Sequence, residues 1–121
     1  MKKHVLIILV LLVTTGSLYA QASIKLEEVK LHIGDSVKVC GKVFGGRFLE
    51  TANGKPTLVN IGGAFPNELL TVVIFGTDRA QFKDKPEEMW LTKTICVTGK
   101  LMLYKDKPQI VVTKMEQVSV Q

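Results

Sequence analysis

Two short stretches of alternating residues constrain this chain most, because each carries a glycine inside a strand-like pattern. In residues 36–44, valines alternate with lysines and a cysteine, and a period of two predicts a β-strand with one buried face. VTGKL at 97–101 repeats the pattern of VCGKV at 39–43. Because a glycine inside a strand marks a bulge or sharp bend, both strands are expected to bend, as a small closed barrel requires.

Three further segments have strand character, and a connection without it separates the third strand from the fourth. The strands are expected at 36–44, where Gly45-Gly46 ends the first, at 57–61, 69–75, 92–104 and 109–114, with 115–120 extending the last. Asp78 to Trp90 lacks strand character, and Pro86 is a favourable first residue for a short helix there. Another short helix, capped by Ser23, is expected to run to His32 before the first strand.

The order of three strands, a helical connection and two strands favours an all-β fold with small helical additions. In five-stranded Greek-key barrels of the OB type, a helix lies between the third and fourth strands. Another small barrel, or a β-sandwich, is the alternative architecture for the same strands. Residues 23–121 have the length of one small domain, and they are expected to form a single barrel.

The first 22 residues have the composition of a secretory signal peptide. MKKH is basic, residues 5–13 are apolar, and small residues precede a cleavage site after Ala20 or Ala22. The apolar run is too short to span a bilayer, which takes about 20 residues. An uncleaved anchor is the alternative. We therefore expect an exported protein, periplasmic or secreted, without a membrane span after cleavage.

The charge of the exported chain is mildly basic. Removing Lys2 and Lys3 from 16 basic and 11 acidic residues leaves a net charge of +3. This balance permits a nucleic acid or another anionic partner without requiring one.

Nearly the whole chain after the leader resembles a group of small exported bacterial OB-fold proteins. The resemblance is carried by HIGDSVKVCGKV (32–43), TLVNIGGAFPN (57–67), LTVVIFGTDRAQF (70–82) and ICVTGKLMLYKDKPQIVV (95–112). These proteins are similar to the anticodon-binding type of nucleic-acid-binding OB domain, and similar domains also occur beside secreted nuclease domains. Asp106 departs from the pattern, because it stands in the hairpin turn where glycine is expected.

The resemblance implies weak, sequence-tolerant binding of single-stranded DNA or RNA. OB barrels bind such strands on the outer face of strands two and three, between the 1–2 and 4–5 loops. Bases stack on aromatic rings while lysine and arginine follow the phosphates. The expected binding residues are Arg47, Phe48, Lys55, Asn60, Phe75, Tyr104, Lys105 and Lys107.

Two other interpretations of this face stay open. The aromatic residues among the candidates can instead fill the core or plug a barrel end. The same face can also bind a protein or a glycan in the bacterial envelope, since OB barrels take oligonucleotides, oligosaccharides and proteins.

The sequence gives little support to catalysis. His32 is the only histidine after the leader, whereas a catalytic zinc site usually uses two or three histidines. The acidic residues are scattered, and no phosphate-binding glycine motif occurs. We therefore expect no enzymatic activity, including nuclease activity, and neither a cofactor nor a metal site.

Cys40 and Cys96 both lie on the polar side of their strands. In an OB barrel the first and fourth strands are neighbours, so the two thiols are expected on the outer surface of paired strands. An exported protein can keep a disulfide there. Closing the loop between them would stabilise the fold by about 4 kcal/mol in the chain-entropy description.

Overall fold

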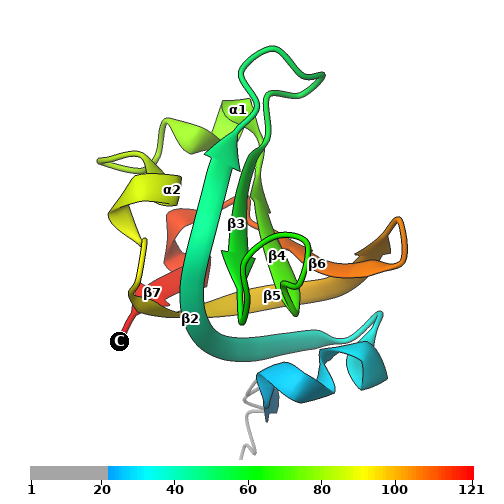
Figure 1. Cartoon of the computed structure of the whole chain (residues 1–121). Helices are drawn as coiled ribbons and strands as arrows, with labels where there is room; N and C mark the ends of the chain where they lie inside the picture. Colours follow the sequence, from blue (N-terminus) through cyan, green and yellow to red (C-terminus); the bar gives the residue numbers. More distant parts are fainter. Residues whose placement is uncertain (1–21) are drawn as a thin grey trace, which may run out of the picture.

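The computed structural model describes residues 22–121. Its elements are β1 (Ala22–Ile24), the 3-10 helix η1 (Leu26–His32), β2 (Ser36–Phe48), β3 (Thr57–Ile61), β4 (Leu70–Ile74), α1 (Gly76–Arg79), α2 (Pro86–Met89), β5 (Thr94–Tyr104), β6 (Lys107–Val111), the 3-10 helix η2 (Met115–Gln117) and β7 (Val118–Val120) (Figure 1). The predicted signal peptide lies outside the described residues except for Ala22, which is in β1. None of the helices within residues 22–121 has the length and apolar character needed to cross a membrane.

Five strands close into a ring, which confirms the predicted barrel. β2 pairs with β3, β3 with β4, β4 with β6 in parallel, and β6 with β5. β5 then pairs back onto β2. The long strand β2 curves around the front of the molecule, with α1 and α2 near its far end (Figure 1). β1 and β7 add to β2 and β5 outside the ring.

The paired glycines of β2 bend this strand instead of ending it. The prediction that the first strand stops at Phe44 is wrong, because β2 continues to Phe48. Opposite β3, its register shifts between Val43 and Gly45, which is the signature of a β-bulge. The extra residue shifts the inward-facing positions by one, so that Val43 lies opposite buried Ile61 before the bulge and Phe48 lies opposite buried Thr57 after it.

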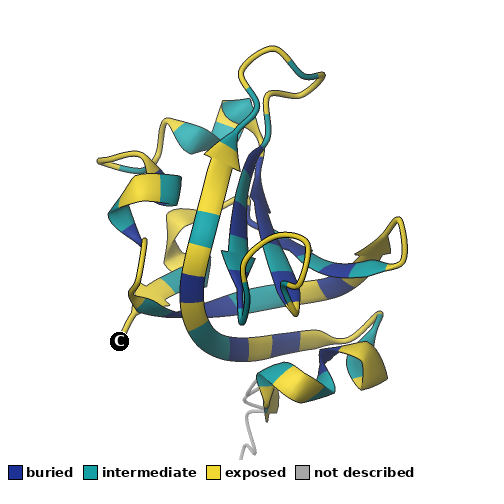
Figure 2. Ribbon diagram, viewed as in Figure 1, coloured by how far each residue is buried: buried dark blue, intermediate teal, exposed yellow. Residues whose placement is uncertain are grey.

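The two glycines that VCGKV and VTGKL share are required by close packing. A Cβ atom on Gly41 would lie 2.5 Å from Ile61 Cγ2, and one on Gly99 would lie 2.6 Å from Ile110 Cγ2. Both glycines therefore let a neighbouring isoleucine pack directly against the strand backbone. The buried positions follow the predicted alternation along β3 and along β2 as far as Val43, and they appear as dark bands in Figure 2. β5 departs from the alternation, because Cys96 is buried between buried Ile95 and Val97.

Each end of the barrel is closed by a different segment. At one end, η1 contributes Val29 to the core. The expected helix from Ser23 is wrong in its start, because Ser23 lies in β1 and no side chain caps η1. At the other end, Trp90 is buried and meets Phe82 edge to face, with 5.4 Å between the ring centroids. These plugs leave the outer faces of the strands for function.

The predicted disulfide is present. Cys40 and Cys96 are direct cross-strand partners on β2 and β5, and their Sγ atoms are bonded. The expectation that both sulfurs lie on the outer surface is wrong for Cys96, which is buried. Ser119 of β7 lies opposite Cys96, and the Gln121 side-chain nitrogen lies 3.9 Å from Cys40 Sγ. The C-terminal segment therefore flanks the bridge.

Candidate nucleic-acid interface

A polar strip crosses the outer side of β3, β4 and β6. It consists of Asn60, Thr71 and Gln109, which are lateral neighbours in the strand register. Val59 and Ile61 are buried, so Asn60 faces outward, as expected. Two strand spacings of about 4.8 Å separate Asn60 from Gln109 by roughly 10 Å. These side chains offer both hydrogen-bond donors and acceptors.

The hairpin between β5 and β6 lies beyond one edge of this strip. Lys105 and Asp106 form its turn with φ angles of 49° and 62°, and a two-residue hairpin with two positive φ angles is favoured by strand twist. Asp106 thus occupies a backbone conformation that glycine would also adopt. Tyr104 is exposed, and Lys105 Nζ lies 5.5 Å from the centre of its ring.

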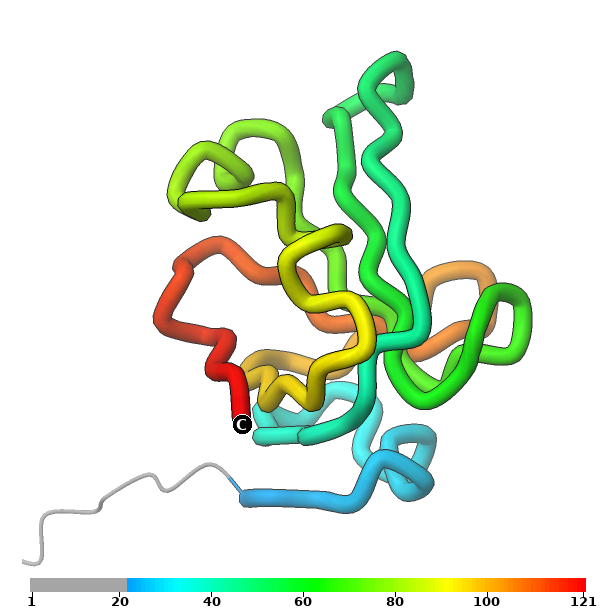
Figure 3. The backbone as a smooth tube through the Cα atoms, turned by 60° about the vertical axis from the view of Figure 1, so that its left-hand side comes forward, coloured from blue at the N-terminus to red at the C-terminus, as the bar shows by residue number. Residues whose placement is uncertain are grey.

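Lys107 ties this hairpin to the loop between β3 and β4. Its Nζ donates to Glu68 Oε1 at 2.9 Å and to the Pro66 carbonyl at 3.1 Å, and it lies 5.2 Å from the centre of the Phe65 ring. The Glu68 side chain is only 4 % exposed. We call these four residues the Lys107 cluster. The hairpin and the loop lie side by side in Figure 3.

Within residues 22–121, Lys107 is the only hydrogen-bond partner of the Glu68 carboxylate. The second oxygen, Oε2, is buried and has no partner among these residues. Removing one member of a buried ion pair typically costs about 3–5 kcal/mol, because the other charge is left uncompensated. Lys107 is 45 % exposed, so solvent reduces this cost. The pair nevertheless holds Lys107 more firmly than an exposed ion pair would.

The other end of the face carries Arg47, Phe48 and Lys55. Arg47 is exposed and lies opposite Leu58 of β3. Lys55 is exposed in the loop between β2 and β3. Phe48 lies opposite buried Thr57, so its ring faces the barrel end. Of these three residues, Arg47 and Lys55 are open to a ligand.

Phe75 supports the loop between β2 and β3. Its ring packs against Gly54, and the Gly76 amide donates to the Gly54 carbonyl at 3.0 Å. Phe75 is partly exposed at this contact. It therefore borders the same end of the face as Lys55.

Arg79 covers the ring of Phe48. Its guanidinium carbon lies 3.8 Å from the ring centre. Nη1 donates to Thr57 Oγ1 at 2.6 Å and to Glu87 Oε2 at 2.7 Å, while Nη2 donates to Glu87 Oε1 at 2.9 Å. The Arg79 and Glu87 side chains are 16 % and 12 % exposed. We call these four residues the Arg79 cluster.

The bidentate ion pair between Arg79 and Glu87 shifts the pKa values of the two side chains in opposite directions. The hydrogen bonds from Arg79 lower the pKa of Glu87 below its ordinary value, against the opposing effect of burial. The same hydrogen bonds raise the pKa of Arg79. Both residues therefore stay charged across the physiological range. The pair joins α1 to α2, and the hydrogen bond from Arg79 to Thr57 of β3 fastens this helical connection to the barrel.

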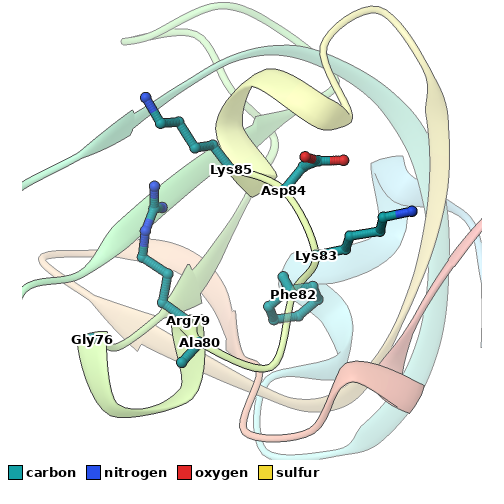
Figure 4. A pocket seen from close by; sticks show the side chains of 7 residues that line it. All are labelled: Gly76, Arg79, Ala80, Phe82, Lys83, Asp84 and Lys85. Atoms are coloured by element: carbon teal, nitrogen blue, oxygen red, sulfur yellow. The ribbon is translucent and has the colours of Figure 1, made fainter.

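A basic hollow lies between α1 and α2. Figure 4 shows its lining, which includes Arg79, Lys83, Asp84 and Lys85. Lys83 and Lys85 extend in different directions (Figure 4), and Arg79 already donates to Glu87 and Thr57. The cations of the hollow thus do not converge on one point, and the strip on β3, β4 and β6 is the stronger candidate.

Comparison with known proteins identifies the architecture. No protein-family model and no curated protein matches the chain. A putative aspartyl-tRNA synthetase from Leishmania major superposes with a TM-score of 0.52 and 12 % identity, over 89 % of this chain and 22 % of that chain. Yeast Stn1 and Ten1 superpose with a TM-score of 0.57 and 13 % identity, over 86 % and 64 %. The domain is an OB fold. It spans less than two thirds of either neighbour's length, and at these identities the likeness concerns the fold alone.

The OB barrel exposes two aromatic rings that were absent from the predicted interface. Phe44 is exposed beside the β-bulge opposite Asn60, and Lys42 Nζ lies 5.3 Å from its ring centre. Phe65 is exposed in the loop between β3 and β4. The exposure of Phe44 could have been predicted, because Phe44 shares the polar side of its strand with Lys38 and Lys42. The exposure of Phe65 could not, because its glycine-rich surroundings indicate only a turn.

Proposed function

We propose that this OB barrel is an exported, non-catalytic module that binds single-stranded nucleic acid with little sequence selectivity. The observation that carries this proposal is the polar strip with a basic group beyond each end. Arg47 and Lys55 lie at one end, and Lys105 lies beside exposed Tyr104 at the other. Lysine and arginine supply phosphate contacts, and aromatic rings supply sequence-tolerant stacking.

Two further observations support parts of this proposal. One structural neighbour is a putative aspartyl-tRNA synthetase, whose name denotes an enzyme that acts on RNA. The bond between Cys40 and Cys96 is of a kind that persists in oxidising compartments, which supports export.

The test is a titration of fluorescent 12-nucleotide DNA and RNA strands at several salt concentrations, followed by anisotropy. Single OB folds cover about 4–16 nucleotides, so this length suits one barrel. Each phosphate contact to a single strand adds about 0.7 to the slope of log K against log salt. The double substitution Arg47→Gln with Lys105→Gln should therefore lower the slope by about 1.4.

A matched control removes the same charge elsewhere. Lys83→Gln with Lys85→Gln takes two cations from the hollow between α1 and α2, and it should leave the slope unchanged. Equal effects of the two double variants would show that net charge, not this face, governs binding. Absence of binding to both DNA and RNA at 20 mM salt would overturn the proposed function.

A further inference from the structure

Phe65 is the most exposed aromatic residue within residues 22–121. Its surface is 74 % exposed. A phenyl ring in this position does not stabilise the fold, because little of its apolar area is removed from water. It lies on the loop between β3 and β4, next to the hairpin that carries Tyr104 (Figure 3). Large exposed rings beside cations are the surfaces on which nucleobases stack.

The loop that carries Phe65 is held by a network of hydrogen bonds. The Asn67 amide donates to the Ala64 carbonyl at 2.7 Å, and the Leu69 amide donates to the Ile61 carbonyl at 3.0 Å. Lys107 adds its bond to the Pro66 carbonyl, directly after Phe65. The ring is therefore presented on an ordered backbone, which lowers the entropy lost when a base stacks on it.

Lys107 is committed to this loop. An ammonium group has three donors, and two of them bond to Glu68 and Pro66. Moving Lys107 to a phosphate would leave the buried Glu68 carboxylate without a partner among the described residues, which is unfavourable. Lys105 is in a different situation. Within residues 22–121 its ammonium makes no hydrogen bond or ion pair, and it lies 5.5 Å from the centre of the Tyr104 ring.

From these contacts we infer that Phe65 is the principal base-stacking residue of the interface, and that Lys107 is a positioning residue for it instead of a phosphate ligand. The ligand class is a single-stranded oligonucleotide with one base on Phe65 and a neighbouring phosphate at Lys105. This inference rests on the proposed function, and it names the end of the face where the strand is held most tightly.

The first experiment measures the affinity of a labelled dT12 strand for Phe65→Ala and for Leu31→Ala. Leu31, on η1, is also highly exposed, so its substitution controls for loss of exposed apolar surface. Removing one stacked base typically lowers affinity about 5- to 150-fold. We expect this loss for Phe65→Ala and no change for Leu31→Ala. Equal affinities of wild type and Phe65→Ala would overturn the inference.

A tryptophan in place of Phe65 reports stacking directly. The chain contains a single tryptophan, Trp90, which is buried in the barrel. Phe65→Trp should retain affinity for dT12, and its fluorescence should be quenched on binding, whereas the wild-type signal should change little. Unquenched fluorescence at saturating dT12 would show that no base stacks at this position.

The second experiment separates positioning from phosphate binding by salt dependence. Lys105→Gln should lower the slope of log K against log salt by about 0.7. Lys107→Gln should weaken binding by at least threefold with an unchanged slope, and Lys107→Arg should restore affinity by keeping the pair with Glu68. A slope change in Lys107→Gln equal to that in Lys105→Gln would make Lys107 a phosphate ligand and overturn its positioning role.

The outcomes keep the two proposals apart. If wild type binds neither DNA nor RNA, the proposed function fails. If wild type binds dT12 while Phe65→Ala binds equally well, only the present inference fails, and bases stack on other residues of the face.

Discussion

The Arg79 cluster and the Lys107 cluster contain the same kinds of group but differ in which group is exposed to solvent. Each contains a cation, a carboxylate and a phenyl ring. In the first, the guanidinium carbon lies 3.8 Å from the Phe48 ring centre and the pair is nearly buried. In the second, the ammonium lies 5.2 Å from the Phe65 ring centre, and Lys107 is half exposed.

The difference lies in which member of each cluster faces solvent. In the Arg79 cluster, the planar guanidinium makes a bidentate bond to Glu87 and stacks on Phe48 at once, as arginine geometry allows. In the Lys107 cluster, the carboxylate is buried while the ring projects outward. The first arrangement uses its ring to stabilise the fold, and the second leaves its ring available to a ligand.

The largest expected effect comes from removing the cation of the Arg79 cluster. Arg79→Ala leaves Glu87 without its bidentate partner, and we expect the free energy of unfolding to fall by about 3–5 kcal/mol. Urea denaturation followed by circular dichroism measures this change. Lys85→Ala, on the same connection, should change it by no more than about 0.5 kcal/mol. If Arg79→Ala lowered the free energy of unfolding by less than about 1 kcal/mol, the Arg79–Glu87 pair would be no stronger than an exposed ion pair. The proposed contrast between the two clusters would then be wrong.

Truncating the two rings gives a smaller and more direct comparison. Phe→Ala in a full core costs about 3–5 kcal/mol, so half-buried Phe48 should lose about 2 kcal/mol of unfolding free energy. Phe65→Ala should stay within about 0.5 kcal/mol of wild type, because its ring is exposed. Parallel urea titrations of the two variants test this difference. Similar losses would show that Phe65 also packs in the folded core.

The smallest expected effect is the acid dependence of the Arg79 cluster. The Arg79 hydrogen bonds hold the pKa of Glu87 below its ordinary value of 4.5. A depressed pKa in the folded state means that the stabilisation is fully present above pH 4.5 and is lost as the pH falls through the folded-state pKa. Urea midpoints between pH 7 and pH 3 should show this loss in wild type.

Substitution of Glu87 checks the source of that acid dependence. Glu87→Gln should have a shallower fall in urea midpoint below pH 4.5 than wild type. Glu88→Gln, at an exposed position of the same helix, is the matched control and should follow wild type. Identical curves for Glu87→Gln and wild type would assign the acid sensitivity to other carboxylates.

The barrel was predictable from local pattern, whereas the two clusters were not. Alternation of valines with lysines placed β2, and the expected range of 57–61 for the second strand agrees with β3. The predicted end of β2 is wrong because paired glycines can mark either a strand end or a bulge, and only pairing with β3 decides between them.

Contacts between distant residues explain why the site was harder to predict. Arg79 reaches Thr57 across 22 positions, and Lys107 reaches Glu68 across 39. Neither separation leaves a periodic signal in the sequence. Basic and aromatic residues could therefore be assigned to loops, but which ring is covered and which is open depends on these long-range bonds.

The bond between Cys40 and Cys96 also determines what a protease can release. The β2–β3 and β3–β4 loops lie between the two cysteines in sequence, whereas the turn at Lys105 and Asp106 lies beyond Cys96. A chain cut in either loop therefore stays a single covalent molecule on a non-reducing gel and separates into two bands only after reduction. A cut at the hairpin turn frees the C-terminal fragment with or without reductant. The proposed oligonucleotide-binding surface thus stays covalently joined after a cut in the β2–β3 or β3–β4 loop, whereas a cut in the β5–β6 hairpin separates part of it from the rest.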